Sequence, residues 1–298
     1  MGTVDEAEQL SRHFEEHRSH LRAVAYRMLG SLAEAEDAVQ DAWLRLDRAD
    51  TTEVENLGGW LTTVVARICL NLLQSRGHRR EEPLDALAPE PAAGHRAAAD
   101  PEQEALLADS VGLAMLVVLD TLAPAERLAF VLHDMFAVPF DDIAPLVERS
   151  PAAARQLASR ARRRVRGAAP APGADLPRQR RVVDAFRAAS RDGDFNALVA
   201  LLDPDVVLRA DRAVGPTPAP IVRHGAQDVA KGAILAAATR SRFTDTALVN
   251  GAVGLVMAPL GRLSLVLGLT VVDDRITAIE ITAEPDRLAL LDLAVLDA

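Results

Sequence analysis

The sequence predicts a multidomain protein in which two all-α domains are followed by an α+β domain. Apolar residues recur at helical spacing through most of residues 5–166, whereas strand-like runs begin only after about residue 200. Two proline-containing stretches, 81–104 and 169–176, have the composition of linkers. We therefore expect three domains, over residues 1–80, 105–168 and 177–298.

The first domain is predicted to contain at least three helices. An apolar stripe ends near Leu29, and Ser31 and Glu34 have the spacing of a capping box for the next helix. That helix places apolar residues on one face and three polar residues on the other, namely Asp37, Gln40 and Asp41. A third helix is predicted from about 57 to 77. This helix and the residues after it carry candidate binding residues of basic, amide and aromatic type, namely Trp60, Arg67, Asn71, Arg76, Arg79 and Arg80.

The second domain ends in a pair of helices joined by a tight turn. Helices are expected at about 105–122 and 124–136, and apolar residues from Phe140 to Val147 then recur at helical spacing. Ser150 suits an N-cap and Pro151 the first helical position. Glu148 stands where such turns often have glycine.

The helix over residues 150–166 is basic although the chain is acidic. It contains six arginines and no acid, whereas the whole chain carries a net charge of −10. A helix-turn-helix whose second helix is basic is typical of proteins that read DNA in the major groove. A solvated basic helix that covers a bundle is the alternative interpretation. Arg155, Gln156, Ser159 and Arg160 are predicted to share the face that enters the major groove. Ser150 and Arg163 complete the predicted DNA-binding set, with Arg163 as a phosphate contact.

The third domain is predicted to be an α+β domain. Helices are expected at 177–191, 194–202 and 226–238. Strands are expected at 206–208, 245–249, 253–257, 262–272 and 275–283. Asp273 and Asp274 mark a hairpin turn between the last two strands.

Composition limits the classes of function. A strongly acidic chain is not expected to bind nucleic acid nonspecifically, so DNA contact must come from local basic patches. Cys69 is the single cysteine and lies in an apolar run, which favours a buried thiol and excludes an intrachain disulfide. No stretch reaches the roughly 18–20 uncharged apolar residues that a membrane span requires. No signal peptide is recognisable, so we expect a cytoplasmic protein. No metal site, catalytic set or cofactor is predicted.

The chain resembles the ECF (extracytoplasmic-function) RNA polymerase sigma factors. Residues 25–29, 35–45 and 60–67 match sigma region 2, and residues 122–126, 131–140 and 152–162 match region 4. The C-terminal part resembles a SnoaL-like domain, of the same fold as nuclear transport factor 2. The J-type group of ECF sigma factors shares this domain order.

This resemblance implies a set of partners and binding residues. Core RNA polymerase would dock on Asp37, Gln40 and Asp41. The basic helix would read the upstream promoter element as duplex DNA. The third helix, with Trp60, would capture the melted downstream element; Trp60 could equally be a core anchor. The resemblance also implies that the C-terminal domain modulates sigma activity through remnants of group signatures, Pro89, Glu90 and Pro91 in the linker and Val249, Asn250 and Gly251 in the domain.

Two other functions stay open from the sequence. The protein could be a DNA-binding sensor whose C-terminal domain takes a small-molecule ligand. It could also be a SnoaL-type enzyme fused to a DNA-binding module, with Asp211 and His224 as acid and base and Asp205 as a substitute.

Overall fold

The computed structural model describes residues 2–49, 54–81, 112–167, 175–215 and 217–296. The chain divides into two compact units. The N-terminal unit comprises residues 1–104 and 122–162, and the C-terminal unit comprises residues 105–121 and 163–298.

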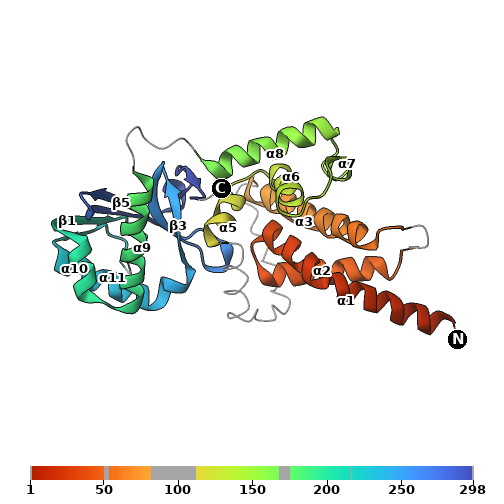
Figure 1. Cartoon of the computed structure of the whole chain (residues 1–298), viewed down its shortest axis with the longest axis horizontal. Coiled ribbons are helices and arrows are strands. Elements are labelled where there is room, and N and C mark those ends of the chain that lie inside the picture. The colour runs from red at the N-terminus through yellow and green to blue at the C-terminus, as the bar shows by residue number, and fades with distance from the viewer. Residues whose placement is uncertain (1, 50–53, 82–111, 168–174, 216, 297–298) are drawn as a thin grey trace. The chain divides into compact units, whose positions relative to one another are not determined.

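Three helices form the base of the N-terminal unit (Figure 1). They are α1 (Gly2–Leu29), α2 (Leu32–Leu46) and α3 (Leu57–Glu81), and each packs against the other two. The Ser31 side chain accepts a hydrogen bond from the backbone N–H of Glu34, as the capping pattern predicts. These three helices confirm the elements expected for the first domain.

The apolar content of α3 belongs to the core of this unit. By length and composition its segment Leu57–Arg76 could cross a membrane. Leu61, Val65 and Cys69, however, are completely buried against the neighbouring helices. Burial raises the pKa of the Cys69 thiol to about 12, so it stays protonated near neutral pH. Cys69 is therefore the buried thiol that the sequence predicts.

The second half of the N-terminal unit is a helix-turn-helix preceded by a broken helix. Its elements are α6 (Pro124–Phe130), the π-helical turn η1 (Val131–Met135), α7 (Phe140–Ile143) and α8 (Pro151–Arg166). The helix expected over 124–136 thus changes to π geometry at Val131. The helix before the turn is only four residues long. Pro145 explains this, because it has no backbone N–H to continue the helical hydrogen bonds.

The C-terminal unit contains a seven-stranded sheet with three helices on one face, namely α9 (Leu176–Asp192), α10 (Phe195–Leu201) and α11 (Ala226–Arg240). The strands are β1 (Leu202–Ala210), β2 (Ile221–His224), β3 (Thr244–Val249), β4 (Ala252–Met257), β5 (Leu265–Val272), β6 (Arg275–Thr282) and β7 (Leu293–Ala294). Short helical turns η2 (Ser241–Phe243), η3 (Pro259–Gly261) and α12 (Pro285–Leu288) join them.

The sheet order is β2-β1-β6-β5-β4-β3-β7, and only the β1–β6 pair is parallel among the described strands. Asp273 and Asp274 both have positive φ, +47° and +62°, as a tight hairpin between β5 and β6 requires. The α+β class is therefore confirmed. Strands β2 and β7, which are four and two residues long, are not predicted from the sequence.

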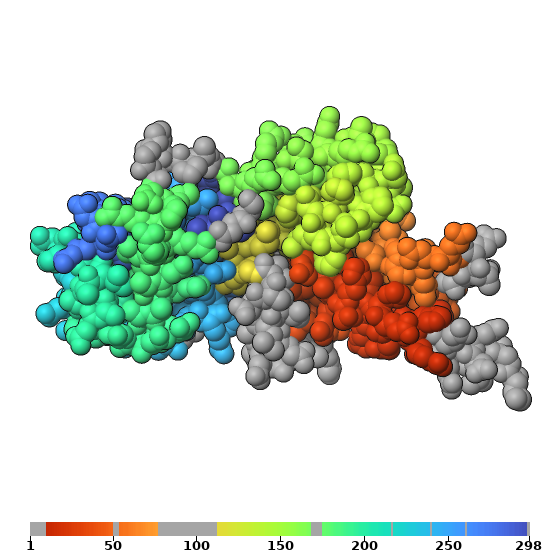
Figure 2. All heavy atoms as spheres, viewed as in Figure 1, coloured from red at the N-terminus to blue at the C-terminus, as the bar shows by residue number. Residues whose placement is uncertain are grey.

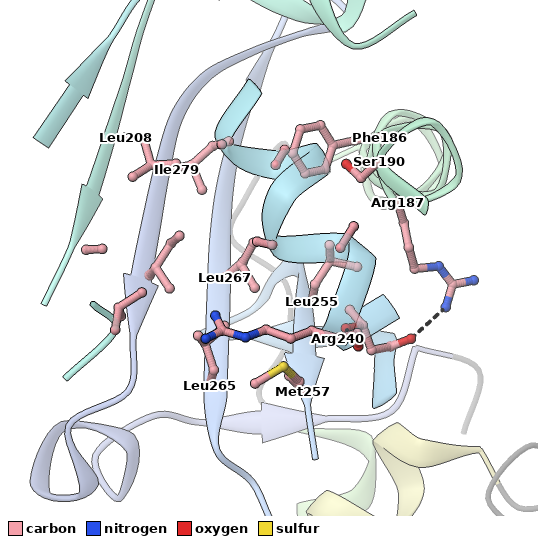
Figure 3. A pocket seen from close by; sticks show the side chains of 18 of the residues that line it. Phe186, Arg187, Ser190, Leu208, Arg240, Leu255, Met257, Leu265, Leu267 and Ile279 are labelled. Carbon is pink, nitrogen blue, oxygen red and sulfur yellow. Dashed lines mark hydrogen bonds between the residues drawn. The ribbon is translucent and has the colours of Figure 1, made fainter. Parts of the chain in front are cut away.

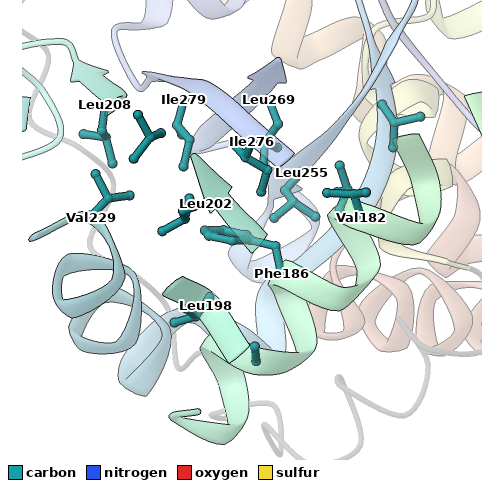
Figure 4. Close-up of a cluster of buried hydrophobic side chains, with 14 of the residues drawn as sticks. Val182, Phe186, Leu198, Leu202, Leu208, Val229, Leu255, Leu269, Ile276 and Ile279 are labelled. Atoms are coloured by element: carbon teal, nitrogen blue, oxygen red, sulfur yellow. The ribbon is translucent and has the colours of Figure 1, made fainter. Parts of the chain in front are cut away.

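The core of the C-terminal unit lies between the helices and the sheet (Figure 4). Val182 and Phe186 of α9, Leu198 of α10 and Val229 of α11 point toward Ile279 and its neighbours on the strands. In the space-filling view, α9, α10 and α11 form much of the green to cyan surface of this unit (Figure 2).

Helix α5 (Leu113–Asp120) belongs to the C-terminal unit, although the sequence analysis placed residues 105–122 in the second domain. It packs against β3 and β7. Six of its eight residues are buried, so it needs apolar cover on several sides. The Asp245 carboxylate of β3 accepts a hydrogen bond from the backbone N–H of Ala114, at the start of the helix. The end of α8 joins the same unit, because the backbone N–H of Val295 donates to the carbonyl of Val165.

Candidate nucleic-acid and protein-binding surfaces

Helix α8 presents the polar face that the sequence predicts. Arg155, Gln156 and Ser159 are exposed, whereas Ala154 and Ala158 are completely buried. The Ser150 hydroxyl accepts a hydrogen bond from the backbone N–H of Ala153, which makes Ser150 the N-cap. The face is therefore available to a partner and its start is fixed by the cap.

Acidic and aromatic neighbours hold three of the arginines on α8. Arg160 pairs with Glu126 at 3.0 Å, and Arg162 pairs with Asp134 at 2.7 Å. The guanidinium of Arg155 lies 5.5 Å from the centre of the Phe140 ring. Sequence reasoning did not find these contacts, because the partners lie 15 to 34 residues away in the chain. Arg163 is exposed.

The turn before α8 contains a strained residue. Glu148 has a φ of +53°, in the left-handed region that favours glycine. The backbone N–H of Arg149 donates to the carbonyl of Ala144, which closes the turn. The unusual turn expected from Glu148 is therefore present.

Helix α2 presents an acidic face opposite its buried face. Asp37, Gln40 and Asp41 are all exposed. Leu44 extends the same face by one turn and is 44% exposed. Leu44 is not among the residues predicted for this face, although its spacing of three and four residues from Asp41 and Gln40 places it there.

Helix α3 carries the residues expected to bind a melted strand. Trp60, Arg67 and Asn71 recur at seven and four residues, so they lie along one face; Arg67 and Asn71 are exposed and Trp60 is half-buried. Arg76 forms an ion pair with Glu34 of α2. Arg79 and Arg80 lie in the last turns of α3, and their side chains lie outside the described part of the structure.

The helices of the two halves of the N-terminal unit contact each other through a buried arginine. Arg127 of α6 is only 2% exposed, and its Nε donates to the carbonyl of Arg27 in α1 at 3.2 Å. Phe136 lies beside the same region: its ring centre is 5.1 Å from the Arg27 guanidinium and 5.2 Å from the His20 ring.

The sequence motifs of the C-terminal unit form internal contacts. Asn250 has a φ of +51° in the β3–β4 turn, and its backbone N–H and side-chain oxygen bond to the backbone of Asp292. Gly251 completes the turn with a φ of +80° and Val249 pairs with Ala252 across it. Pro89, Glu90 and Pro91 lie outside the described residues.

Asp211 has a structural role in this unit. Its carboxylate accepts hydrogen bonds from the backbone N–H groups of Ala283, Glu284 and Ala213 at 2.8, 2.9 and 3.1 Å. Burial by itself would raise the pKa of Asp211, but these bonds and the charge of Arg287 lower it. The carboxylate thus joins the loop after β1 to the segment after β6.

The pair proposed for SnoaL-type acid–base chemistry does not converge. Asp211 is occupied by backbone donors, and His224 and Asp205 are exposed. Within the described residues, none of the three lines the apolar cavity of about 220 Å³ between the helices and the sheet, although Asp211 lines a second, more polar hollow beside β1 and β2. That assignment of an acid and a base is therefore not supported. No cluster of potential metal ligands occurs among the described residues.

Comparisons with known proteins agree with this architecture. Residues 13–79 match the sigma-70 region 2 model, and residues 113–165 match the sigma-70 region 4 model. The ECF RNA polymerase sigma factor SigJ of Mycobacterium tuberculosis is 41% identical over 92% of this chain and 91% of its own length. The probable ECF sigma factor SigI of the same species is 35% identical over 91% of this chain and 92% of its own length.

The crystal structure of SigJ also matches, with 36% identity, a TM-score of 0.45, and coverage of 93% of this chain and 98% of that chain. Two helical sigma regions with a helix-turn-helix, followed by an α+β domain, define an alternative sigma factor. The chain belongs to the ECF family of RNA polymerase sigma factors. As a sigma factor it acts with core RNA polymerase and promoter DNA in transcription initiation.

Proposed function

We propose that this sigma factor docks on core polymerase through α2, reads the upstream promoter element with α8, and captures the melted downstream element along α3. Its C-terminal unit sets how readily region 4 engages the promoter. These partners place its action in the cytoplasm. One observation carries most of the proposal: α2 exposes Asp37, Gln40 and Asp41 together on the face opposite its buried residues.

Charge and an apolar contact on the same face suit a basic protein partner. Carboxylates across an interface set encounter rate and register, whereas a leucine at its centre adds buried apolar area. Leu44 lies one turn from Asp41 and would be that apolar contact. The partner side is expected to offer arginines.

Charge reversal on α2 tests the docking surface. The double substitution Asp37→Arg and Asp41→Arg should abolish pull-down of core polymerase by the full chain while its far-ultraviolet circular dichroism is unchanged. The control is Glu16→Arg with Glu55→Arg, which changes net charge equally at two other exposed acids of the unit. Normal pull-down by the first double variant would refute docking through this face.

Control by the C-terminal unit is supported by the position of α5. This helix lies within the span that matches sigma region 4, yet it packs on β3 and β7. Asp245 anchors its first turn and is itself bound by Arg187 of α9 at 3.0 Å. A change in the sheet domain can therefore reach the first helix of region 4 through a short set of polar contacts.

A substitution of Asp245 tests whether the C-terminal unit controls region 4. Asp245→Asn removes the charge that holds both Arg187 and the N-terminus of α5, so we expect less transcription from a promoter that depends on the upstream element. The rates are compared at equal occupancy of core polymerase. Asp205→Asn, at an exposed position, is the matched control. Equal rates for Asp245→Asn and the wild type would contradict control through α5.

A further inference from the structure

A cavity of about 220 Å³ lies in the C-terminal unit between the helices and the sheet (Figure 3). Its wall is almost entirely apolar, with Phe186 from α9 on one side and Leu255, Leu267 and Ile279 from the strands on the other. Ligand pockets are typically concave, apolar and supplied with a few placed polar groups. The volume is below the roughly 300–1,000 Å³ of pockets for drug-sized molecules, so the occupant would be small.

Ser190 supplies one polar group in this wall. The residue is only 9% exposed, and its Oγ is buried with no hydrogen-bond partner in the described structure. In Figure 3 its hydroxyl lies on the cavity side of α9, beside Phe186. An unpaired buried hydroxyl is costly, and an oxygen of a bound molecule would satisfy it.

Among the described residues that line this cavity, only arginines are charged. Arg187 is already paired with Asp245. Arg240 and Arg223 have no ion-pair partner in the described part of the chain, and Figure 3 shows the Arg240 side chain crossing the cavity from the end of α11. Arg223 lies against Gly232, where an added Cβ would come within 3.6 Å of its Nε. Arg223 therefore lies in van der Waals reach of α11.

We propose that this cavity binds a small apolar monocarboxylate that carries a second oxygen, as a hydroxyl or keto group, on its chain. The carboxylate pairs with Arg240 and Arg223, the chain fills the apolar wall, and the second oxygen bonds to the Ser190 hydroxyl. Guanidinium groups bind carboxylates in a bidentate manner, and none of the described lining residues is an acid that would oppose the negative charge. This site would exist whether or not the C-terminal unit controls transcription.

The charge assignment is tested with two probes, octanoate and octan-1-ol, titrated calorimetrically into the full chain. Octanoate should bind, and Arg240→Gln should weaken it about fivefold, the upper range for a partly exposed ion pair. The affinity for octan-1-ol should be the same for the variant and the wild type. Arg262→Gln, at an exposed arginine outside the cavity, should leave both affinities unchanged.

The location is tested by filling the cavity. Ala237→Phe and, separately, Ala233→Leu add bulk at half-buried positions of α11 in the wall, and each should abolish binding of both probes. Circular dichroism of each variant reports whether the unit remains folded. The site is refuted if octanoate fails to bind the wild type, or if folded filling variants bind it normally. Equal octanoate affinities for Arg240→Gln and the wild type would refute the carboxylate contact.

The role of Ser190 is tested by comparing 8-hydroxyoctanoate with octanoate. The hydroxy acid should bind the wild type about fivefold more tightly, as one net hydrogen bond of about 1 kcal/mol implies. Ser190→Ala should remove this preference without changing octanoate affinity. Equal binding of the two acids to the wild type would overturn the second contact.

Discussion

At the scale of single residues, Glu148 shows a local conflict between sequence and backbone. A residue with a Cβ in the left-handed region costs roughly 1–2 kcal/mol. Glycine is free of that cost, although it loses more backbone entropy on folding. The turn between α7 and α8 nevertheless holds Glu148 at a φ of +53°.

Glu148→Gly is therefore expected to raise the free energy of unfolding of the N-terminal unit by about 0.5–1 kcal/mol. The measurement is a denaturant titration followed through the helical signal. Glu148→Ala is the control, because it removes the same charge but keeps the Cβ and should not stabilise the unit. Equal stabilities of the glycine and alanine variants would show that the backbone is unstrained here.

Asp211 is a second residue whose effect can be measured. Its lowered pKa means that the folded unit favours the ionised carboxylate relative to the unfolded chain, whose value is 3.8. Its contribution to stability is thus fully present above about pH 4 and is lost as the pH falls through the lower folded pKa. Asp211→Asn should lower the free energy of unfolding at pH 7 by about 1–3 kcal/mol, because an amide presents one acceptor oxygen instead of two.

The same substitution should also reduce the loss of stability between pH 4 and pH 2, measured by thermal unfolding of the full chain. Asp228→Asn, at an exposed position of α11, should change neither quantity. A wild-type pH profile that Asp211→Asn does not alter would contradict the assigned role of this carboxylate.

At the scale of elements, α8 separates two kinds of arginine. Arg155 lies near the N-terminus of the helix, over Phe140, whereas Arg163 is exposed in its last turn. Residues near the start of a recognition helix contact base edges, and arginines elsewhere commonly contact phosphates. The two positions should therefore have different effects on promoter binding.

Arg155→Ala should cost about 1–3 kcal/mol of discrimination between the cognate upstream element and a single-base variant of it. Arg163→Ala should weaken binding to all sequences alike and reduce the salt dependence. Both are measured by titrating promoter DNA with the reconstituted holoenzyme at several salt concentrations. The assignment fails if Arg155→Ala loses affinity equally for cognate and variant DNA.

The faces of α2, α3 and α8 could be predicted from the sequence because helical spacing alone decides which residues share a face. The ion pairs Arg160–Glu126 and Arg76–Glu34 could not be predicted from the sequence, because each joins residues from different helices. The same holds for Asp211, because two of its three backbone donors, Ala283 and Glu284, lie 72 and 73 residues further along the chain. Sequence alone offered it as a catalytic acid.

At the scale of the whole molecule, the region 4 segment is divided between the two compact units. Helix α5 lies with the sheet, and its buried residues include Leu116 and Leu119, which are completely inaccessible there. A chain that ends at residue 168 lacks β3 and β7, so these side chains lose their cover. Such a truncation therefore removes the C-terminal domain and also uncovers the apolar side chains of α5.

We expect a chain of residues 1–168 to expose apolar surface at α5, measured as stronger binding of the dye ANS than by the full chain. The same truncation with Leu116→Gln and Leu119→Gln should bind the dye less, because the apolar side chains are gone. Dye binding by residues 1–168 no stronger than by the full chain would show that α5 finds other cover.

The sequence by itself determined the order of the helical and α+β domains, the two helices of the helix-turn-helix, and the buried state of Cys69. These follow from helical periodicity, capping residues and local composition, which act between residues close in the chain. Only the tertiary structure decided that α5 packs on the sheet, that β2 and β7 complete it, and that Asp211 binds backbone donors. It also decided that an apolar cavity is lined by Arg223, Arg240 and Ser190, whose hydroxyl has no hydrogen-bond partner among the described residues. Each of these depends on contacts between residues far apart in the chain, which hydrophobic periodicity does not specify.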